Sequence, residues 1–221
     1  MPRPDAHALV RGFYGIVNVT ADGPDPVEAA ASMARGGARC IQLRYKDADP
    51  RTMRVVARGL RETSRIMGFA LVIDDFADVA GEVKADGVHV GQQDLTCAEA
   101  RRIVGSGALV GVSTHNEAQL LAAIEAGADY VGFGPIFPSV SKGSPDPVVG
   151  LDGLVKALSI SPVPVVAIGG ITLRNAREVV RTGVHAITAI DAVYSSGDVQ
   201  SAAEAFGVFF ATNRHAVAKK S

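Results

Sequence analysis

The sequence predicts an α/β protein consisting of a single (β/α)8 TIM barrel, and three observations lead to this prediction. First, short apolar runs alternate with helical patterns, which gives eight strand-then-helix units along the chain. Second, these runs are almost continuously apolar, as in a parallel sheet that is covered on both faces. Third, no G-x-G-x-x-G turn follows the first strand, which argues against an open doubly wound sheet.

The elements follow in a regular order. Apolar runs of four to seven residues predict strands at Phe13–Val19, Cys40–Arg44, Ala70–Ile73, Gly87–Val90, Leu109–Val112, Tyr130–Phe133, Val165–Ile168 and Ala186–Ile190. The segments between them predict helices at about Pro26–Arg35, Pro50–Met67, Phe76–Val83, Cys97–Val104, Glu117–Glu125, Leu151–Leu158, Leu173–Arg181 and Gln200–Ala211. Several of these helices end at a glycine that suits a left-handed C-cap, at Gly36-Gly37, Gly68, Gly127 and Gly183.

The length and composition indicate one domain. The chain has 221 residues and is 48% hydrophobic, enough for one sizeable core. We therefore expect residues 1–221 to form one barrel domain. A short flexible N-terminus (about 1–11) and a polar, frayed C-terminal tail (about 213–221) are expected at its ends.

Charge and cysteine content exclude several classes of protein. The net charge is −1, with no long block of like charge, so binding to nucleic acid or to a membrane surface is not indicated. Cys40 and Cys97 lie in no C-x-x-C motif, and we interpret them as buried, reduced thiols. No apolar stretch has the length of a signal peptide or of a membrane span. We expect a cytoplasmic protein with small-molecule partners, and the sequence leaves a homo-oligomeric state open.

The segment IQLRYK carries the clearest site pattern in the chain. Gln42, Arg44 and Lys46 lie two residues apart, so a strand would place all three on one face. Two of them are cations suited to oxyanions. The alternative is an edge strand with one wetted face.

Carboxylates follow the next two strands. Asp74 and Asp75 come after the third strand and Asp94 comes after the fourth, and in a (β/α)8 barrel the strand ends converge on one site. Such carboxylates can hold Mg²⁺, which keeps waters and substrate phosphates in its shell. The alternative for each is a helix cap or a turn. Together with Arg44 and Lys46, they indicate a magnesium-bound pyrophosphate.

Hydroxyl groups and a histidine follow the fifth strand, at Ser113, Thr114 and His115. His115 is either a general acid or base or a structural hydrogen-bonding residue. None of the five histidines forms an i, i+4 pair, so a zinc site is not predicted.

The later loops carry two further features. The longest connection follows the sixth strand and contains Ser139, Ser141 and Lys142, which suits a lid that closes over phosphate; a bland linker is the alternative. After the seventh strand, Gly169-Gly170 opens a helix. Loops after strands seven and eight often bind phosphate in (β/α)8 barrels.

With these motifs assembled, the chain resembles the thiamine phosphate synthase family from about Tyr14 to Phe210. The matching segments are IQLRYKD, LVIDDFADVA, ADGVHVGQQDL, VGVSTH, AGADYVGFGPIFP and VVAIGGIT. The resemblance implies a (β/α)8 transferase that joins 4-amino-2-methyl-5-hydroxymethylpyrimidine diphosphate to a thiazole phosphate. The implied products are thiamine phosphate and pyrophosphate, and the implied cofactor is Mg²⁺.

The resemblance also implies roles for the residues on the pyrimidine side. Gln42, Arg44 and Lys46 look like the contacts to the pyrimidine diphosphate, with both cations on the diphosphate. Asp75 and Asp94 resemble the magnesium ligands.

The family pattern implies that the remaining matched residues bind the substrates or contact the leaving pyrophosphate. Ser113 matches a pyrimidine-site serine, and Lys142 matches the lid lysine that meets the pyrophosphate. The hydroxyl pair Ser139 and Ser141, and also Gly170, match positions that hold phosphate.

The mechanism implied is a dissociative substitution. Loss of pyrophosphate builds negative charge that Arg44, Lys46, Lys142 and Mg²⁺ are suited to stabilise before the thiazole nitrogen attacks. The electron-rich aminopyrimidine stabilises the remaining cation, so no protein nucleophile is required.

Three departures from the family pattern concern the substrate-binding positions. Asp74 stands where Asn is common, which adds negative charge beside a diphosphate. Ser139 and Ser141 stand where threonines are usual. Asp191 stands where serine is common, against the thiazole phosphate, and a carboxylate there is repulsive unless a cation or a rotation intervenes.

Two other functions compete with the synthase. One is the related thiazole tautomerase, in which His115 would be the leading catalyst. The other is a non-catalytic barrel that binds thiazole or thiamine phosphates. This hypothesis is based on Asp74 and Asp191, which depart from the family pattern. Arg44 and Lys46 favour the synthase, because neither alternative needs a diphosphate site.

Overall fold

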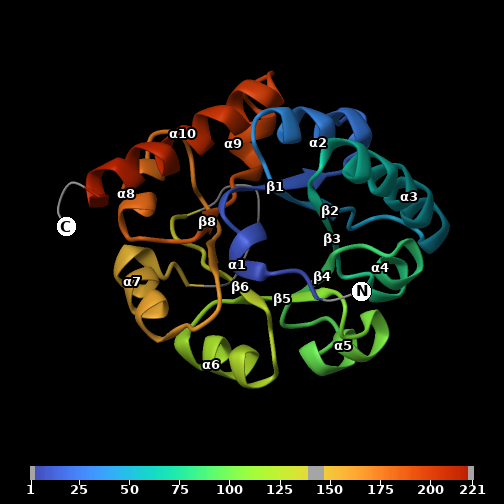
Figure 1. The fold of residues 1–221 in the computed structure, drawn as a ribbon, viewed down its shortest axis with the longest axis horizontal. Coiled ribbons are helices and arrows are strands. Elements are labelled where there is room, and N and C mark those ends of the chain that lie inside the picture. The colour runs from blue at the N-terminus through green and yellow to red at the C-terminus, as the bar shows by residue number, and fades with distance from the viewer. Residues whose placement is uncertain (1–2, 139–146, 219–221) are drawn as a thin grey trace.

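Eight parallel strands close into a barrel in which each strand pairs with the next and β8 pairs with β1. The computed structural model describes residues 3–138 and 147–218. Figure 1 shows the ring of strands surrounded by helices. The strands are β1 (Gly12–Asn18), β2 (Cys40–Arg44), β3 (Ala70–Asp74), β4 (Gly87–Val90), β5 (Leu109–Thr114), β6 (Tyr130–Phe133), β7 (Val165–Ala167) and β8 (Ala186–Ile187). The predicted (β/α)8 fold is therefore confirmed.

Helices connect the strands on the outside of the barrel. They are α2 (Pro26–Arg35), α3 (Pro50–Met67), α4 (Ala77–Val83), α5 (Cys97–Val104), α6 (Glu117–Glu125), α7 (Gly150–Ile160), α8 (Ala176–Arg181), α9 (Ile190–Tyr194) and α10 (Val199–Ala218). Gly68 ends α3 in the left-handed conformation with φ 78°, as the sequence predicts for a glycine C-cap.

Strand alternation divides the core into two layers. The larger layer packs the outward side chains of the strands against the helices and includes Ile41, Leu43, Leu60 and Phe206, all fully buried. The smaller layer fills the barrel interior and includes Tyr14, Cys40 and Tyr130. Because side chains of one strand alternate between these layers, the inward residues near the strand ends reach the open end of the barrel.

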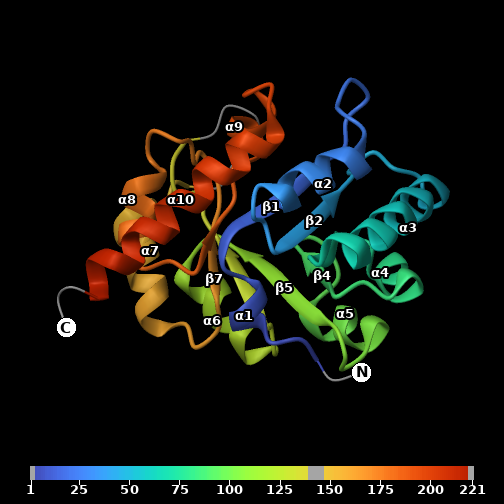
Figure 2. The same ribbon diagram turned by 45° about the horizontal axis from the view of Figure 1, so that its top comes forward.

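The N-terminal segment closes the opposite end of the barrel. The segment expected to be flexible contains a short helix, α1 (Ala6–Leu9), and Figure 2 shows it at the lower end of the barrel. Val10 is fully buried in the interior layer. Arg3 forms an ion pair with Asp129 at 2.9 Å and donates to the carbonyl of Ser106. These contacts hold the N-terminal segment against the barrel. Its helix α1 has only four residues, too few to show helical periodicity in the sequence.

The last units differ most from the expected boundaries. β8 ends at Ile187, not at Ile190, because the chain turns into α9 there. α8 begins at Ala176, not at Leu173, because the Asn175 side chain accepts from the backbone N–H of Thr172 and forms a turn first. α10 continues to Ala218, so most of the tail expected to be frayed has helical backbone. In the described part of the chain, no helix is long and apolar enough to cross a membrane.

Candidate active site

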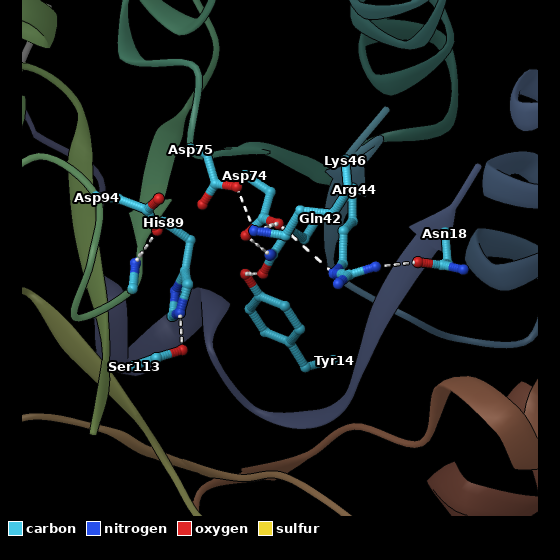
Figure 3. Close-up of polar contacts among 11 residues, drawn as sticks. Tyr14, Asn18, Gln42, Arg44, Lys46, Asp74, Asp75, His89, Asp94 and Ser113 are labelled. Carbon is cyan, nitrogen blue, oxygen red and sulfur yellow. Dashed lines mark hydrogen bonds and ion pairs between the residues drawn. The ribbon is translucent and has the colours of Figure 1, made fainter. Parts of the chain in front are cut away.

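Three side chains that follow one another at intervals of two residues converge on one carboxylate. Gln42 donates from Nε2 to Oδ1 of Asp74 at 2.5 Å. Arg44 Nε and Lys46 Nζ each lie 3.7 Å from Oδ2 of the same residue, as Figure 3 shows. Because all three reach Asp74, they share one side of the chain, as the sequence predicted. The edge-strand alternative is wrong, since β2 pairs with both β1 and β3.

The two cations have further anionic or polar neighbours at the open end of the barrel. Arg44 donates to Oδ1 of Asn18 at 2.6 Å, which orients its guanidinium from β1. Lys46 forms an ion pair with Asp75. Burial alone would lower the pKa of Lys46, but the carboxylates of Asp75, Asp74 and Asp94 raise it above its ordinary value. Lys46 therefore remains a cation at the site.

A pair of carboxylates lies beside these cations. Burial raises the pKa of Asp75, Lys46 lowers it, and the carboxylate of Asp94 raises it, so the net direction is upward. Asp75 has a left-handed backbone with φ 62°, which is unusual for a residue other than glycine. A divalent cation beside Asp75 and Asp94 would offset the burial and the like charge that raise the pKa of Asp75.

Neither of these carboxylates caps the helix that follows it. Phe76 occupies the N-cap of α4 without a side-chain bond, and Thr96 caps α5. The turn alternative for Asp94 is present, since its Oδ2 accepts from the N–H of Gly91 at 2.8 Å. Among the described residues, no group of three or more His, Cys, Asp or Glu side chains surrounds a metal position. Asp75 and Asp94 offer two carboxylates, so waters and substrate oxygens would have to complete the shell of any Mg²⁺ bound there.

A polar chain that the sequence did not predict runs through the barrel interior. Tyr14 donates to Oε1 of Gln42 at 2.9 Å, and its hydroxyl lies 2.9 Å from that of Tyr130. The Tyr130 hydroxyl lies 3.1 Å from Nδ1 of His89, whose Nε2 lies 2.9 Å from Oγ of Ser113. Figure 3 shows Tyr14 below Gln42 and His89 pointing to Ser113. The predicted site residues Gln42 and Ser113 are therefore joined through three residues that were missed.

These residues were missed because aromatic side chains in apolar strands have the pattern of a core. A usable signal was the alternation itself: Tyr14, His89 and Tyr130 occupy inward positions of three different strands. Their hydroxyl and imidazole groups require partners when buried. Buried inward polar groups on several strands therefore indicate an interior network.

His115 has a structural contact. Its ring Nδ1 donates to the carbonyl of Gly134 at 2.7 Å, and its backbone N–H donates to Oε1 of Gln119. This bond joins the end of β5 to the beginning of the connection after β6. The structural interpretation of this histidine is thus supported by geometry.

The predicted phosphate corner is only partly described. Ser139, Ser141 and Lys142 lie outside the described residues. Gly170 has φ 67°, and a Cβ added there would lie 2.6 Å from the carbonyl oxygen of Phe137, so only glycine fits against this loop. Asp191 is exposed in the first turn of α9.

Comparisons with known proteins point to one family. A family model described as thiamine monophosphate synthase matches residues 13–193. The thiamine-phosphate synthase of Anaeromyxobacter dehalogenans is 41% identical over 214 residues, which cover 95% of this chain and 92% of the relative. That of Chloroflexus aurantiacus is 45% identical over 168 residues, 76% of this chain and 77% of the relative. The solved thiamine phosphate pyrophosphorylase from Pyrococcus furiosus superimposes with a TM-score of 0.84 at 36% identity, covering 93% of this chain and 98% of that one.

Proposed function

The chain belongs to the thiamine monophosphate synthase family, and from this premise we propose how its residues carry out the synthase reaction. It is a transferase of thiamine biosynthesis. The proposed substrates are 4-amino-2-methyl-5-hydroxymethylpyrimidine diphosphate and 4-methyl-5-(2-phosphooxyethyl)thiazole. The observation that supports this most strongly is the convergence of Arg44 and Lys46 on Asp74 at the open end of the barrel, where Lys46 also pairs with Asp75.

We assign the diphosphate of the pyrimidine substrate to Arg44 and Lys46. Arg44 presents a planar guanidinium that Asn18 holds in place, and Lys46 presents an ammonium that is about half exposed and pairs with Asp75. Lys46 is charged in the free protein because the carboxylates beside it raise its pKa. Lys142 would supply a third cation from the connection after β6.

Asp75 and Asp94 fit a Mg²⁺ ion. Burial, and then the neighbouring carboxylate of Asp94, raise the pKa of Asp75, and a divalent cation held by both residues would relieve their repulsion. When bound, Mg²⁺ would neutralise charge on the diphosphate and so favour its departure. Lys46, which contacts Asp75, would join this cation site to the diphosphate site.

The remaining substrate groups are assigned by position. Gln42 and Ser113, at the ends of the interior polar chain, would contact the pyrimidine ring. Gly170, in the loop after β7, and Asp191, in the first turn of α9 after β8, would lie beside the thiazole phosphate. Ser139 and Ser141 would add hydroxyls to the same phosphate.

The chemistry needs charge stabilisation and positioning. When the bond between the pyrimidine methylene and the diphosphate breaks, the electron pair leaves with pyrophosphate, and Arg44, Lys46 and Lys142 stabilise it. The aminopyrimidine carries the positive charge until the thiazole nitrogen forms the new carbon–nitrogen bond. No side chain of the protein has to form a covalent bond, so positioning of the two substrates is the main contribution of the barrel.

The geometry does not favour the two competing functions. His115, the leading candidate catalyst of a tautomerase, donates from Nδ1 to the Gly134 carbonyl, and the cations and carboxylates at the open end of the barrel would have no part in that reaction. A binding-only barrel has no need for two cations beside two carboxylates. We also propose a cytoplasmic location, because Cys40 and Cys97 are buried free thiols.

A direct assay tests the proposal. Purified protein is incubated with both substrates and Mg²⁺, and thiamine phosphate and pyrophosphate are quantified, with EDTA and no-thiazole controls. We expect equal amounts of both products, formed only with metal. Arg44→Ala should reduce turnover strongly and His115→Ala should not; the reverse pattern would contradict the diphosphate mechanism and favour the tautomerase.

A further inference from the structure

We propose that Tyr14, Tyr130 and His89 are positioning residues that, with Asp74 at one end, make the Ser113 hydroxyl a hydrogen-bond acceptor toward the ligand. The hydrogen bonds between Asp74 and Ser113 run in one direction only. As an acceptor, the Ser113 hydroxyl favours a ligand with a hydrogen-bond donor next to it, such as an exocyclic amine, over a ligand with a carbonyl at that position. The identity of the ligand rests on the proposed function, whereas the direction of the chain does not.

The direction is set at Asp74. Arg44 Nε and Lys46 Nζ lie 3.7 Å from its Oδ2, so two donors face this side chain and place it as a hydrogen-bond acceptor. Gln42 must therefore turn its Nε2 toward Asp74, where the distance is 2.5 Å. Its carbonyl Oε1 then faces Tyr14 at 2.9 Å, and the Tyr14 hydroxyl has to donate.

The hydrogen bonds of Tyr14 and Tyr130 keep the same donor-to-acceptor direction. Burial raises the pKa of both phenols well above the ordinary value of a tyrosine, so each keeps its single proton. Tyr14 uses its proton on Gln42, and the contact of 2.9 Å with Tyr130 therefore requires Tyr130 to donate. The proton of Tyr130 is then also used, and its oxygen has to accept from Nδ1 of His89 at 3.1 Å.

His89 determines whether the Ser113 hydroxyl donates or accepts a hydrogen bond at the ligand site. A neutral imidazole carries one ring proton, so with that proton on Nδ1 the Nε2 of buried His89 is unprotonated. The hydroxyl of Ser113, 2.9 Å away, donates to that nitrogen. Its proton is thereby used, and only its lone pairs remain for a ligand.

The ligand that fits is one with a hydrogen-bond donor at this point. An aminopyrimidine carries such a donor in its exocyclic amine, and a pyrimidine with a carbonyl there would meet the oxygen lone pairs of Ser113. The same reasoning gives a role to the carboxylate at position 74. An amide such as asparagine can face either way, so it would let the whole chain reverse, whereas Asp74 permits one direction.

The tautomer of His89 is the direct readout, and it requires no ligand. In protein labelled with ¹⁵N-histidine, two-bond ¹H–¹⁵N correlation spectra distinguish Nδ1–H from Nε2–H, and His89→Gln assigns the resonance among the five histidines. We expect the Nδ1–H tautomer in the wild-type protein, although free neutral histidine prefers Nε2–H. Finding Nε2–H for His89 in the wild type would overturn the proposal.

Removing a hydroxyl from the chain should change the tautomer. Tyr130→Phe takes away the acceptor for Nδ1–H, and Tyr14→Phe frees the Tyr130 proton to donate to Nδ1. Both variants should move His89 to Nε2–H, and each keeps its aromatic ring in place. Tyr194→Phe is the matched control, because its largely buried hydroxyl binds the backbone of Asn18 and lies outside the chain. Retention of Nδ1–H in both chain variants would refute the mechanism.

Ligand selection is the second readout. Binding of the 4-amino and the 4-oxo pyrimidine methyl diphosphates is measured by calorimetry with Mg²⁺ and without thiazole. We expect the wild type to prefer the amine by about tenfold or more, since the oxo ligand leaves lone pairs facing each other. In Tyr130→Phe this ratio should fall toward one. An unchanged ratio would refute the role in selection, and failure of both ligands to bind would overturn the proposed function while leaving the measured tautomer intact.

Discussion

The carboxylate of Asp74 competes with the substrate diphosphate for two cations, so its replacement by asparagine should tighten diphosphate binding. Asp74→Asn keeps an oxygen that accepts from Gln42, but it removes the charge that lies 3.7 Å from Arg44 and Lys46. A phosphate oxygen about 3 Å beyond either cation would lie about 7 Å from the carboxylate. At that separation, one pair of like charges costs about 0.6 kcal/mol in water and about 2.4 kcal/mol at an effective dielectric constant of 20.

An intermediate value of about 1.4 kcal/mol corresponds to about tenfold tighter binding. The assay is calorimetric titration of inorganic pyrophosphate in the presence of Mg²⁺, at constant ionic strength. Asp78→Asn is the matched control, because it removes the same charge from an exposed ion pair with Arg54 and should change nothing. Weaker binding by Asp74→Asn would contradict this electrostatic competition and show that Asp74 acts chiefly by holding the two cations in place.

Three further predictions concern other parts of the barrel. Asp191→Ser should preserve the affinity for the thiazole phosphate or improve it up to about tenfold in calorimetry, because a repelling carboxylate is removed, and a large loss would show a positive role for that carboxylate. Phe206→Ala removes a fully buried ring and should lower the free energy of unfolding in urea by about 3–5 kcal/mol, whereas a loss below about 1 kcal/mol would contradict the assigned packing. Burial lowers the pKa of His185, and His7 and Arg11 lower it further. Because the unfolded chain then binds more protons, this stabilisation is complete above about pH 6.5 and is lost as the pH falls through the folded pKa; His185→Gln should flatten that decline, and an unchanged pH profile would exclude the linkage.

The sequence predicted the fold well where periodicity was long and simple. β2, β4 and β6 have the expected bounds, as do α2, α3, α5 and α6. The spacing of Gln42, Arg44 and Lys46 correctly placed three polar groups beside one another, because a period of two is a direct property of strand geometry. For these elements and side chains, the local sequence pattern was sufficient to predict the structure.

Predictions failed where the outcome depends on contacts across the barrel. The apolar residues after Ile187 have strand character, yet the chain leaves the sheet and forms α9. Tyr14 and Tyr130 are 116 residues apart, and their hydroxyl contact follows only from the closure of the barrel. Position 74 could be recognised as a departure from the family, but its effect on two cations and one amide required the folded geometry.

The dependence of pyrophosphate release on Mg²⁺ concentration, compared between the wild type and Asp75→Asn, tests the proposed cation site. The variant keeps the size of the side chain and removes one of the two carboxylates assigned to the metal, while Arg44 remains in place for the diphosphate. If Asp75 and Asp94 hold the cation, the Mg²⁺ concentration at half-maximal activity should rise by about tenfold or more, in line with loss of one charged ligand. An unchanged Mg²⁺ dependence would contradict the assignment of the cation site and with it the arrangement proposed for the diphosphate.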